Sequence, residues 1–530
     1  MIKYIKNAGA VFYMVLFCPC FLFWADNLTI NEILFRVGLV SILAAIALSY
    51  LVSFTSGKTY KTILTVLFIL SIPANIITWS YLYTAKQWMT VSSLWVIFST
   101  NTKEATEYIS QFTDITNIFV AVLYVIVGII LIAFAKNEKR ISFKKLVDKI
   151  MFPVAFITVT LVMISHYLTM AVPTFSLYHS VIRFAAYNND MRNMLHLSEN
   201  MPSASCNLQD GTSHVFVIVI GESTNIYHQN IYGYSRETTP MQSLLKKNGE
   251  LIVYKDVVTP HVSTRNSLEK VLSFANHDFP KKMITEPSIV DIVNSAGFTS
   301  YWVNNQEISG MWQSPVCYVC ANHSYFLIDL INENNDAAVI EPFYKILSDS
   351  SRNKIIFLHL VGNHFAYSNR YPSTFNKFDH KNQLLEDKNF RTEYMKQTID
   401  EYDNSILFGD YLLNEIIDTL RKIDVSSFVL FFSDHGEDVY DDRDFLGHQS
   451  VVFPTQYQAR VPFVLWRSSL YLKEVPEIII DTIRPYNTED LIHSVATLMR
   501  ISYPSVDSTR SIFSPYFTKR QRFVEKTKWK

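Results

Sequence analysis

Two apolar runs in the second half of the chain end in side chains that can bind a metal ion. Residues 215–220 lead through a glycine to Glu222, and residues 428–432 lead through a serine to Asp434 and His435. Uninterrupted runs of Val, Ile and Phe that stop at a turn residue are typical of buried strands in a parallel sheet, and ligands bind beyond the carboxyl ends of such strands. The pattern therefore predicts a site at these strand ends.

A divalent cation would explain why two carboxylates and an imidazole follow buried strands. Zinc accepts carboxylate and imidazole ligands at about 2.0 to 2.2 Å, and a catalytic zinc site keeps one position open. The alternative is that Glu222, Asp434 and His435 only cap helices or satisfy loop backbone. From the residues alone, both interpretations stay open.

A hydroxyl-rich turn between the two runs supplies a candidate nucleophile. Residues 258–267 include Ser263 and Thr264 and lead into a helical pattern at residues 268–274. Either hydroxyl can serve as a simple N-cap. In the functional interpretation, a threonine hydroxyl bound to zinc loses its proton more readily and attacks phosphorus, while helix N–H groups stabilise the anion.

Three further histidines lie near these motifs. His359 is within an apolar run, His364 follows a Gly-Asn pair, and His448 follows a glycine. A single histidine is more often structural than functional, and His359 fits the structural interpretation best because its surroundings are apolar.

The first third of the chain is apolar enough to cross a membrane several times. Because a helix of ~20 residues spans a bilayer, we expect a transmembrane helix at each of five stretches, namely residues 8–24, 33–54, 63–83, 118–135 and 151–168. A cleaved signal peptide is the alternative for the first stretch, and a buried soluble helix for any single one. Lysine and arginine gather before the first stretch, after the second and between the fourth and fifth, which predicts that residues after 170 lie outside the cytoplasm.

The remaining segments complete the expected organisation. Residues 88–98 and 175–197 mix aromatic and polar side chains as interfacial helices do, residues 198–213 have a linker composition, and the basic residues 519–530 are expected to be a solvated end. After residue 214, strand-like runs alternate with helical patterns, which favours a doubly wound α/β domain. The expected strands are residues 299–303, 354–360, 428–432 and 462–466, with a long helix at 395–421. The expected domains are 1–170 (transmembrane), 171–213 (interfacial helices and linker) and 214–530 (catalytic).

Composition excludes some classes of function. The formal net charge of −1 gives no basic surface for nucleic acid, so the bilayer is the expected surface partner. Among five cysteines, Cys317 and Cys320 form the plausible local pair. A disulfide is the favoured interpretation in an oxidising compartment, and two free thiols are the alternative.

Together these motifs resemble the phosphoethanolamine transferases of Gram-negative inner membranes, within the alkaline phosphatase superfamily. The resemblance covers nearly the whole chain and rests on Gly221-Glu222-Ser223-Thr224, residues 232–240, 302–306 and 359–372, and Ser433-Asp434-His435-Gly436-Glu437. It implies an α/β fold: a bundle of five transmembrane helices in the bacterial inner membrane, followed by a periplasmic sulfatase-like domain. We expect a monomer.

The resemblance also implies a site and a mechanism. One zinc ion or two would be held by Glu222, Asp434, His435 and Thr264, and Thr264 would be the nucleophile. His364 and His448 would contact the phosphoryl group or a second zinc, and Asn305 the substrate. Phosphoethanolamine would pass from phosphatidylethanolamine to Thr264, releasing diacylglycerol, and then to lipopolysaccharide. A less anionic surface with weaker binding of cationic antimicrobial peptides would follow.

The choice of acceptor rests on a departure from the lipid A branch of that family. Pro260 and His261 stand where that branch has a cysteine, and residues 232–240, 272–276 and 503–511 resemble the branch that modifies core heptose. The core sugar is therefore favoured over lipid A, Kdo or another periplasmic glycan. A sulfatase or phosphodiesterase and a lipoteichoic-acid-type synthase are the rival enzymes, and a membrane sensor with a degenerate domain is the non-enzymatic alternative.

Overall fold

The structure is a computed structural model of the 530-residue chain. It describes residues 12, 16, 28–85, 115–135, 146–164, 172–179, 182, 194–197, 201–209, 211–306, 314–330, 333–381, 385, 388–423, 425–448 and 453–530. The chain divides into two compact units, Met1–Tyr187 and Asn188–Lys530. Both stretches with interfacial-helix character and the first apolar stretch lie wholly or mostly outside the described residues.

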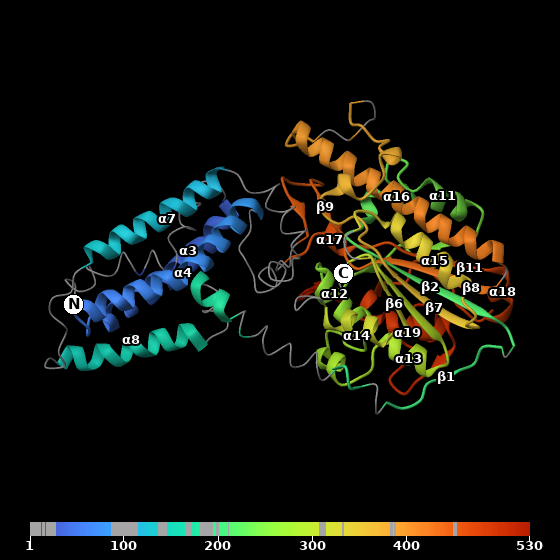
Figure 1. Ribbon diagram of the computed structural model, residues 1–530, viewed down its shortest axis with the longest axis horizontal. Coiled ribbons are helices and arrows are strands. Elements are labelled where there is room, and N and C mark those ends of the chain that lie inside the picture. The colour runs from blue at the N-terminus through green and yellow to red at the C-terminus, as the bar shows by residue number, and fades with distance from the viewer. Residues whose placement is uncertain are drawn as a thin grey trace. The chain divides into compact units, whose positions relative to one another are not determined.

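The first unit is helical (Figure 1). Its long helices are α3 (Leu28–Val52), α4 (Gly57–Ala85), α7 (Ile115–Phe134) and α8 (Leu146–Ile164), which cover the second to fifth predicted stretches. By length and composition, Gly57–Tyr83 and Val147–Ile164 can cross a membrane, while Val37–Val52 and Ile118–Phe134 are shorter apolar helices.

Contacts within the first unit show how α4 and α7 associate. Tyr124 on α7 forms hydrogen bonds with Ser71 and Asn75 on α4, at 2.9 and 3.1 Å. Polar side chains that pair between apolar helices are typical of packing inside lipid. Elsewhere on α7, large apolar side chains are exposed, including Phe119 at 64% and Phe134 at 78%. An exposed apolar surface of this kind fits a lipid-facing helix.

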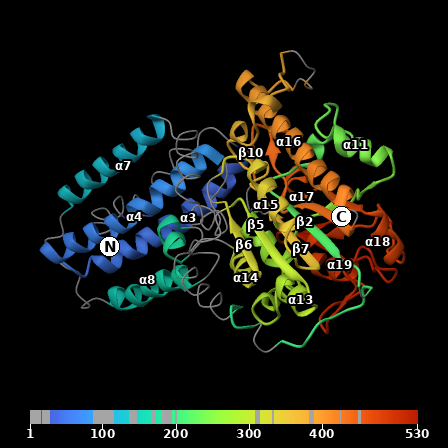
Figure 2. The ribbon, with the colours of Figure 1, turned by 45° about the vertical axis from the view of Figure 1, so that its right-hand side comes forward.

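The second unit is built on a seven-stranded sheet with the order β3-β11-β8-β2-β7-β5-β6 (Figures 1 and 2). The strands are β2 (His214–Gly221), β3 (Leu251–Val253), β5 (Thr299–Asn304), β6 (Phe326–Asp329), β7 (Asn353–His359), β8 (Ser426–Ser433) and β11 (Phe463–Arg467). All five strands expected from the sequence are present, as β2, β5, β7, β8 and β11.

The sheet is mixed rather than fully parallel. β2, β5, β6, β7 and β8 run parallel, whereas β11 pairs antiparallel with both β8 and β3. For β11 to run parallel to β8, the chain would first have to cross back to the end of the sheet where β8 begins. Instead, the chain after β8 forms the small hairpin β9 (Asp438–Val439) and β10 (Leu446–Gly447) and then enters β11. Local apolar patterning carries no information on this direction.

Helices cover both faces of the sheet, and β2 shows why. Phe216, Ile218 and Ile220 belong to one core cluster, while Val217 and Val219 belong to the other, as alternating side chains require. Burying each such side chain contributes about 1.5–3 kcal/mol. The first face carries α12 (Thr264–Val271), α13 (Ile289–Ser295), α14 (Pro315–His323) and α19 (Leu491–Leu498), and the second carries α11 (Pro240–Lys247), α15 (Ile340–Leu347) and α16 (Glu393–Ile423) (Figure 1).

Two expectations from the sequence are wrong. The basic segment 519–530 is not a solvated end, because it forms the hairpin β14 (Arg522–Val524) and β15 (Thr527–Trp529) with Val524 fully buried. Its lysines alternate with less polar residues, so one face of the hairpin can pack while the charges stay exposed. Cys317 and Cys320 are free, buried thiols of α14 rather than a disulfide.

Candidate active site

The predicted ligands meet because β2 and β8 are parallel neighbours in register. Gly221 lies opposite Ser433, so Glu222 and Asp434 leave the same edge of the sheet side by side. A backbone hydrogen bond of 3.0 Å from Asp434 N–H to the Gly221 carbonyl extends the pairing beyond the strands. The strand ends therefore carry the site, as their apolar runs predict.

Four side chains converge there. The His435 Nε2 atom lies 3.1 Å from Glu222 Oε1 and 3.4 Å from Asp434 Oδ2. The Thr264 hydroxyl donates to Glu222 Oε2 at 2.9 Å and lies 3.2 Å from His435 Nε2. Glu222, Asp434 and His435 are buried, whereas Thr264 is partly exposed. A substrate can therefore reach the hydroxyl while the ligands stay shielded.

The bonding of these groups fits a cation. The His435 Nδ1–H donates to the Gly436 carbonyl at 2.8 Å, which leaves the Nε2 lone pair directed at the two carboxylates. Asp434 Oδ2 is buried and accepts no hydrogen bond from any described residue. A buried carboxylate oxygen without a donor is unfavourable unless a positive charge faces it. The donor set of two carboxylates, one imidazole and one hydroxyl suits zinc.

The pKa shifts of the two carboxyl groups also indicate a site for a cation. Burial, followed by the charge of Glu222, raises the pKa of Asp434 well above its usual range. Burial also acts to raise the pKa of Glu222, but the neighbouring His435 outweighs it and brings the pKa well below normal. The two adjacent buried carboxyl groups thus cannot both ionise easily without a cation between them.

The start of α12 fixes the hydroxyl of Thr264. Thr264 is the first helical residue, preceded by Ser263 in an extended conformation. One turn later, Ser267 donates to the backbone carbonyl of Asp434 at 2.7 Å, and Thr259 donates to the same oxygen at 2.5 Å. The helix start is thereby joined directly to the loop that carries the ligands.

His448 reaches the site through a carboxylate that sequence analysis did not single out. Its Nδ1 atom lies 2.6 Å from Glu437 Oε2, and its ring centroid is 4.0 Å from that of His435. The second oxygen of Glu437 accepts from the Tyr367 hydroxyl at 2.8 Å. Because Nδ1–H donates a hydrogen bond to the carboxylate, the Nε2 atom of His448 remains available to the substrate. Glu437 was recognisable only as part of the motif around His435.

The other predicted residues take different positions. His364 follows β7, and its charge contributes to lowering the pKa of Glu222. The side-chain amide of Asn305 instead donates to Asp336 at 2.8 Å, a contact that supports the loop before His364. His359 lies buried with its Nδ1 atom 2.8 Å from Asn304, consistent with the structural interpretation.

Gln306 is a site residue that sequence analysis did not assign. Its amide donates to the Leu360 carbonyl at 2.7 Å and to Glu222 Oε2 at 3.3 Å. It thereby orients the carboxylate that also receives the Thr264 hydroxyl. Gln306 reaches Leu360 because β5 and β7 are neighbours in the sheet, and the local sequence does not reveal which strands are neighbours.

Gly362 permits the close approach of the two loops. Its φ of +53° is in the left-handed region, and an added Cβ would lie 2.7 Å from the Glu222 nitrogen. Gly362→Ala should therefore lower the free energy of unfolding by about 1–3 kcal/mol and weaken metal binding, measured by chemical denaturation and metal content. Gly409→Ala is the matched control, because its Cβ meets nothing within 4 Å and alanine favours its helix. Equal stability of the two variants would contradict the prediction.

A buried network of charged side chains connects the segments after β2 and β9 to α16. His228 lies 2.6 Å from Asp403 on α16 and 3.1 Å from Asp441. Burial acts to lower the pKa of His228, but Asp441 and Asp403 outweigh it and raise the pKa to about 10. Asn225 extends the network, since its side chain donates to the Glu437 carbonyl at 2.9 Å.

Because of this network, the folded state should lose stability as the pH becomes alkaline. Because the pKa of His228 in the folded protein is above the ordinary histidine value of 6.5, the stabilisation from His228 is complete below pH 6.5. It is lost as the pH rises toward about 10. We expect urea unfolding to show a loss of the order of a few kcal/mol across this window. His228→Gln should remove that part of the pH dependence, and an unchanged slope in the variant would contradict the assignment.

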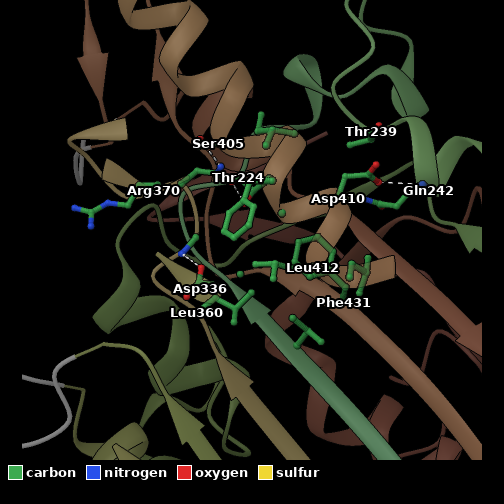
Figure 3. Close-up of a pocket in the computed structure, with 18 of the residues that line it drawn as sticks. Thr224, Thr239, Gln242, Asp336, Leu360, Arg370, Ser405, Asp410, Leu412 and Phe431 are labelled. Carbon is green, nitrogen blue, oxygen red and sulfur yellow. Dashed lines mark hydrogen bonds between the residues drawn. The ribbon is translucent and has the colours of Figure 1, made fainter. Parts of the chain in front are cut away.

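A small cavity of about 40 Å³ lies behind the site, between α16 and the sheet (Figure 3). Thr224, Ser405 and Asp410 line it, and Asp410 accepts from the backbone N–H of Gln242 at 2.9 Å. The Gln242 amide oxygen has no hydrogen-bond partner among the described residues. Most of the other lining residues are apolar, among them Val339, Leu412 and Phe431. At this volume the cavity is too small for a lipid headgroup.

Comparisons with known proteins identify relatives of both units. The sulfatase family model matches residues 214–501. The chain is 28% identical to phosphoethanolamine transferase EptC of Escherichia coli K12 over 497 residues, covering 89% of this chain and 85% of that protein. It is 29% identical to phosphoethanolamine transferase CptA of Salmonella typhimurium over 480 residues, covering 85% and 82%.

Two solved structures are similar. The C-terminal periplasmic domain of E. coli EptC, crystallised in complex with Zn, is 30% identical with a TM-score of 0.57, covering 61% of this chain and 93% of that domain. The integral membrane lipooligosaccharide phosphoethanolamine transferase A from Neisseria meningitidis covers 97% of both chains with a TM-score of 0.68. At 18% identity, the second similarity concerns the fold alone.

Proposed function

Because the chain belongs to the phosphoethanolamine transferases within the sulfatase family, we propose that it transfers phosphoethanolamine from phosphatidylethanolamine to the core heptose of lipopolysaccharide. The observation that carries the proposal is the Thr264 hydroxyl at the start of α12, hydrogen-bonded to Glu222 and next to His435. A hydroxyl with an adjacent acceptor and a helix N-terminus suits attack on a phosphate diester.

Glu222, Asp434, His435 and Thr264 are the residues that would hold zinc. The orphaned Asp434 Oδ2 atom and the directed lone pair of His435 support this assignment. Bound zinc would make the Thr264 hydroxyl easier to deprotonate and would add positive charge beside the phosphoryl oxygens. The periplasmic domain of E. coli EptC crystallised in complex with Zn supports zinc as the metal, and His448 with Glu437 offers donors for a second ion.

The reaction has two steps that use Thr264 twice. In the first, Thr264 Oγ1 loses its proton and attacks phosphorus, and the bond from phosphorus to the diacylglycerol oxygen breaks. Diacylglycerol leaves after that oxygen takes up a proton, and phosphoethanolamine remains on Thr264. In the second, an acceptor hydroxyl loses its proton and its oxygen attacks the same phosphorus. The bond from phosphorus to Thr264 Oγ1 breaks, and Oγ1 takes up a proton, which restores the hydroxyl. We assign His364 and His448 the role of stabilising the charge on the phosphoryl oxygens. The electrostatic effect of His364 on Glu222 and the ring distance of 4.0 Å between His448 and His435 support this role.

We assign the helical first unit to the inner membrane, with five spans, and the second unit to the periplasm. Four helices at the predicted stretches and the exposed apolar surface of α7 support this topology. Phosphatidylethanolamine and lipopolysaccharide are both reached from that side of the membrane. The favoured acceptor is core heptose because the matches to EptC and CptA extend over most of the chain.

Mass spectrometry of lipopolysaccharide tests the proposal. Cells with the protein should carry phosphoethanolamine on the core fragment, and cells without it should lack this group. Addition to the lipid A fragment would retain the transfer but refute the acceptor. No phosphoethanolamine on either fragment would refute the function and favour a hydrolase or a lipoteichoic-acid-type synthase.

A further inference from the structure

The hairpin β14–β15 packs on the loop that precedes the nucleophile. Val524 and Trp529 of the hairpin lie in one apolar cluster with Val262, which is fully buried two residues before Thr264. Arg522 holds the hairpin through an ion pair with Asp256 at 2.8 Å. The hairpin is therefore a firmly held element beside the nucleophile loop, here defined as residues 259–263.

At the hairpin tip, Glu525 contacts the nucleophile loop and His277. Its carboxylate accepts from the Val262 N–H at 3.1 Å and from His261 Nδ1 at 2.9 Å. Its backbone N–H donates to the Pro260 carbonyl at 2.9 Å, and its own carbonyl accepts from His277 at 2.6 Å. Three consecutive residues of the nucleophile loop are thus bonded to a single glutamate.

The residue type at this tip is unexpected for a turn. Val524 pairs with Thr527, so Glu525 and Lys526 form a two-residue loop. Such loops favour Gly, Asn or Asp because the backbone has positive φ, and Glu525 has a φ of +55°. A glutamate adopts this conformation at a cost, and strained residues persist where their side chains serve function. The carboxylate, and not the turn, accounts for its presence.

The opposite side of the nucleophile loop is bonded to the segment after β8, which carries the candidate metal ligands Asp434 and His435. Thr259 Oγ1 donates to the Asp434 carbonyl at 2.5 Å. The loop therefore lies between two anchors, Asp434 on the inside and Glu525 on the outside, and Thr264 follows directly. Displacing a reacting group by about 1 Å can reduce turnover by about 10²-fold.

We propose that Glu525 is a positioning residue, which holds the nucleophile loop so that the Thr264 hydroxyl stays aligned with the substrate phosphorus. The proposal rests on the proposed function, because it assigns Thr264 the role of nucleophile. Glu525 itself touches neither the candidate ligands nor the Thr264 hydroxyl in any contact described for it.

Three variants of the full-length protein in detergent separate positioning from folding. Glu525→Gly relieves the positive φ but removes the carboxylate, Glu525→Gln keeps an acceptor oxygen, and Lys526→Ala changes the other, exposed turn residue. Release of diacylglycerol from fluorescent phosphatidylethanolamine gives kcat and KM. Zinc content, melting temperature and hydrogen exchange at the Val262 amide are measured on the same samples.

For Glu525→Gly we expect kcat to fall at least about tenfold with KM nearly unchanged. Its melting temperature and zinc content should equal or exceed those of the wild type, and the Val262 amide should exchange faster. Glu525→Gln should recover most of kcat, and Lys526→Ala should match the wild type. Wild-type kcat in Glu525→Gly, or a loss of kcat that follows a loss of zinc or stability, would overturn the proposal.

The two proposals fail in different ways. If the wild type releases no diacylglycerol, the proposed function fails, while the Val262 amide still tests the contact because its exchange needs no substrate. If the wild type is active and Glu525→Gly leaves both kcat and Val262 exchange unchanged, only the positioning role fails.

Discussion

Thr264→Ala should abolish transfer because it removes the nucleophile, while Glu222, Asp434 and His435 remain to hold zinc. The hydroxyl lies 2.9 Å from Glu222 Oε2 and is the partly exposed member of an otherwise buried group. Removing the nucleophile of a hydrolase can cost up to about 10⁶-fold in turnover, so we expect a loss of at least about 10³-fold. The measurement is intact-protein mass spectrometry after mixing with phosphatidylethanolamine, which should detect a phosphoethanolamine adduct on the wild type alone.

Two variants control for local structure. Thr264→Ser keeps the hydroxyl and should retain the adduct. Ser263→Ala removes the neighbouring hydroxyl, whose Oγ is buried with no hydrogen-bond partner among the described residues, and should leave turnover nearly unchanged. An adduct of equal yield on Thr264→Ala, or its loss in Ser263→Ala, would move the nucleophile elsewhere.

Metal removal should have the second largest effect. A strong chelator should abolish turnover and lower the melting temperature, and zinc should restore both, because Glu222 and Asp434 are adjacent, buried carboxyl groups. A ligand present at 100 times its Kd stabilises the folded state by about 2.7 kcal/mol. Magnesium should not substitute, since it prefers six oxygen ligands and keeps its water.

Asp434→Asn provides a sharper version of this experiment. The metal-free variant should melt at or above the temperature of the metal-free wild type, because burial already raises the pKa of Asp434 and favours a neutral group. Zinc should then raise the melting temperature of the wild type but not of the variant. A zinc-induced shift of equal size in both proteins would exclude Asp434 as a ligand.

The structure brings together residues that local pattern singles out at strand ends and helix starts. Glu222, Asp434 and Thr264 each adjoin an apolar run or a helical pattern in the sequence, and their roles as ligands and nucleophile stay predictions. The long helix expected at residues 395–421 is α16, Glu393–Ile423, for the same reason. Such signals are local, and burial on both faces makes them strong.

The residues that were missed depend on contacts between distant segments. Gln306 reaches Glu222 only because β5 and β7 pair, and Glu525 reaches Val262 only because a hairpin folds back across the domain. The antiparallel direction of β11 is equally invisible to the period of its side chains. For Asn305, contact with the substrate stays a prediction, since its described amide contacts are with Asp336 and Asn335.

The position of β2 at the centre of the sheet also governs how the catalytic unit matures. Gly221 pairs with Ser433, about 200 positions later in the chain, so sequence separation between contacting residues is large and folding is expected to be slow. In the proposed periplasmic location, β2 would leave the membrane during export with both edges unpaired until β7 and β8 follow. Unpaired apolar strands of this kind favour aggregation and binding by chaperones. Under that proposal, the incomplete domain would need protection for most of its translocation.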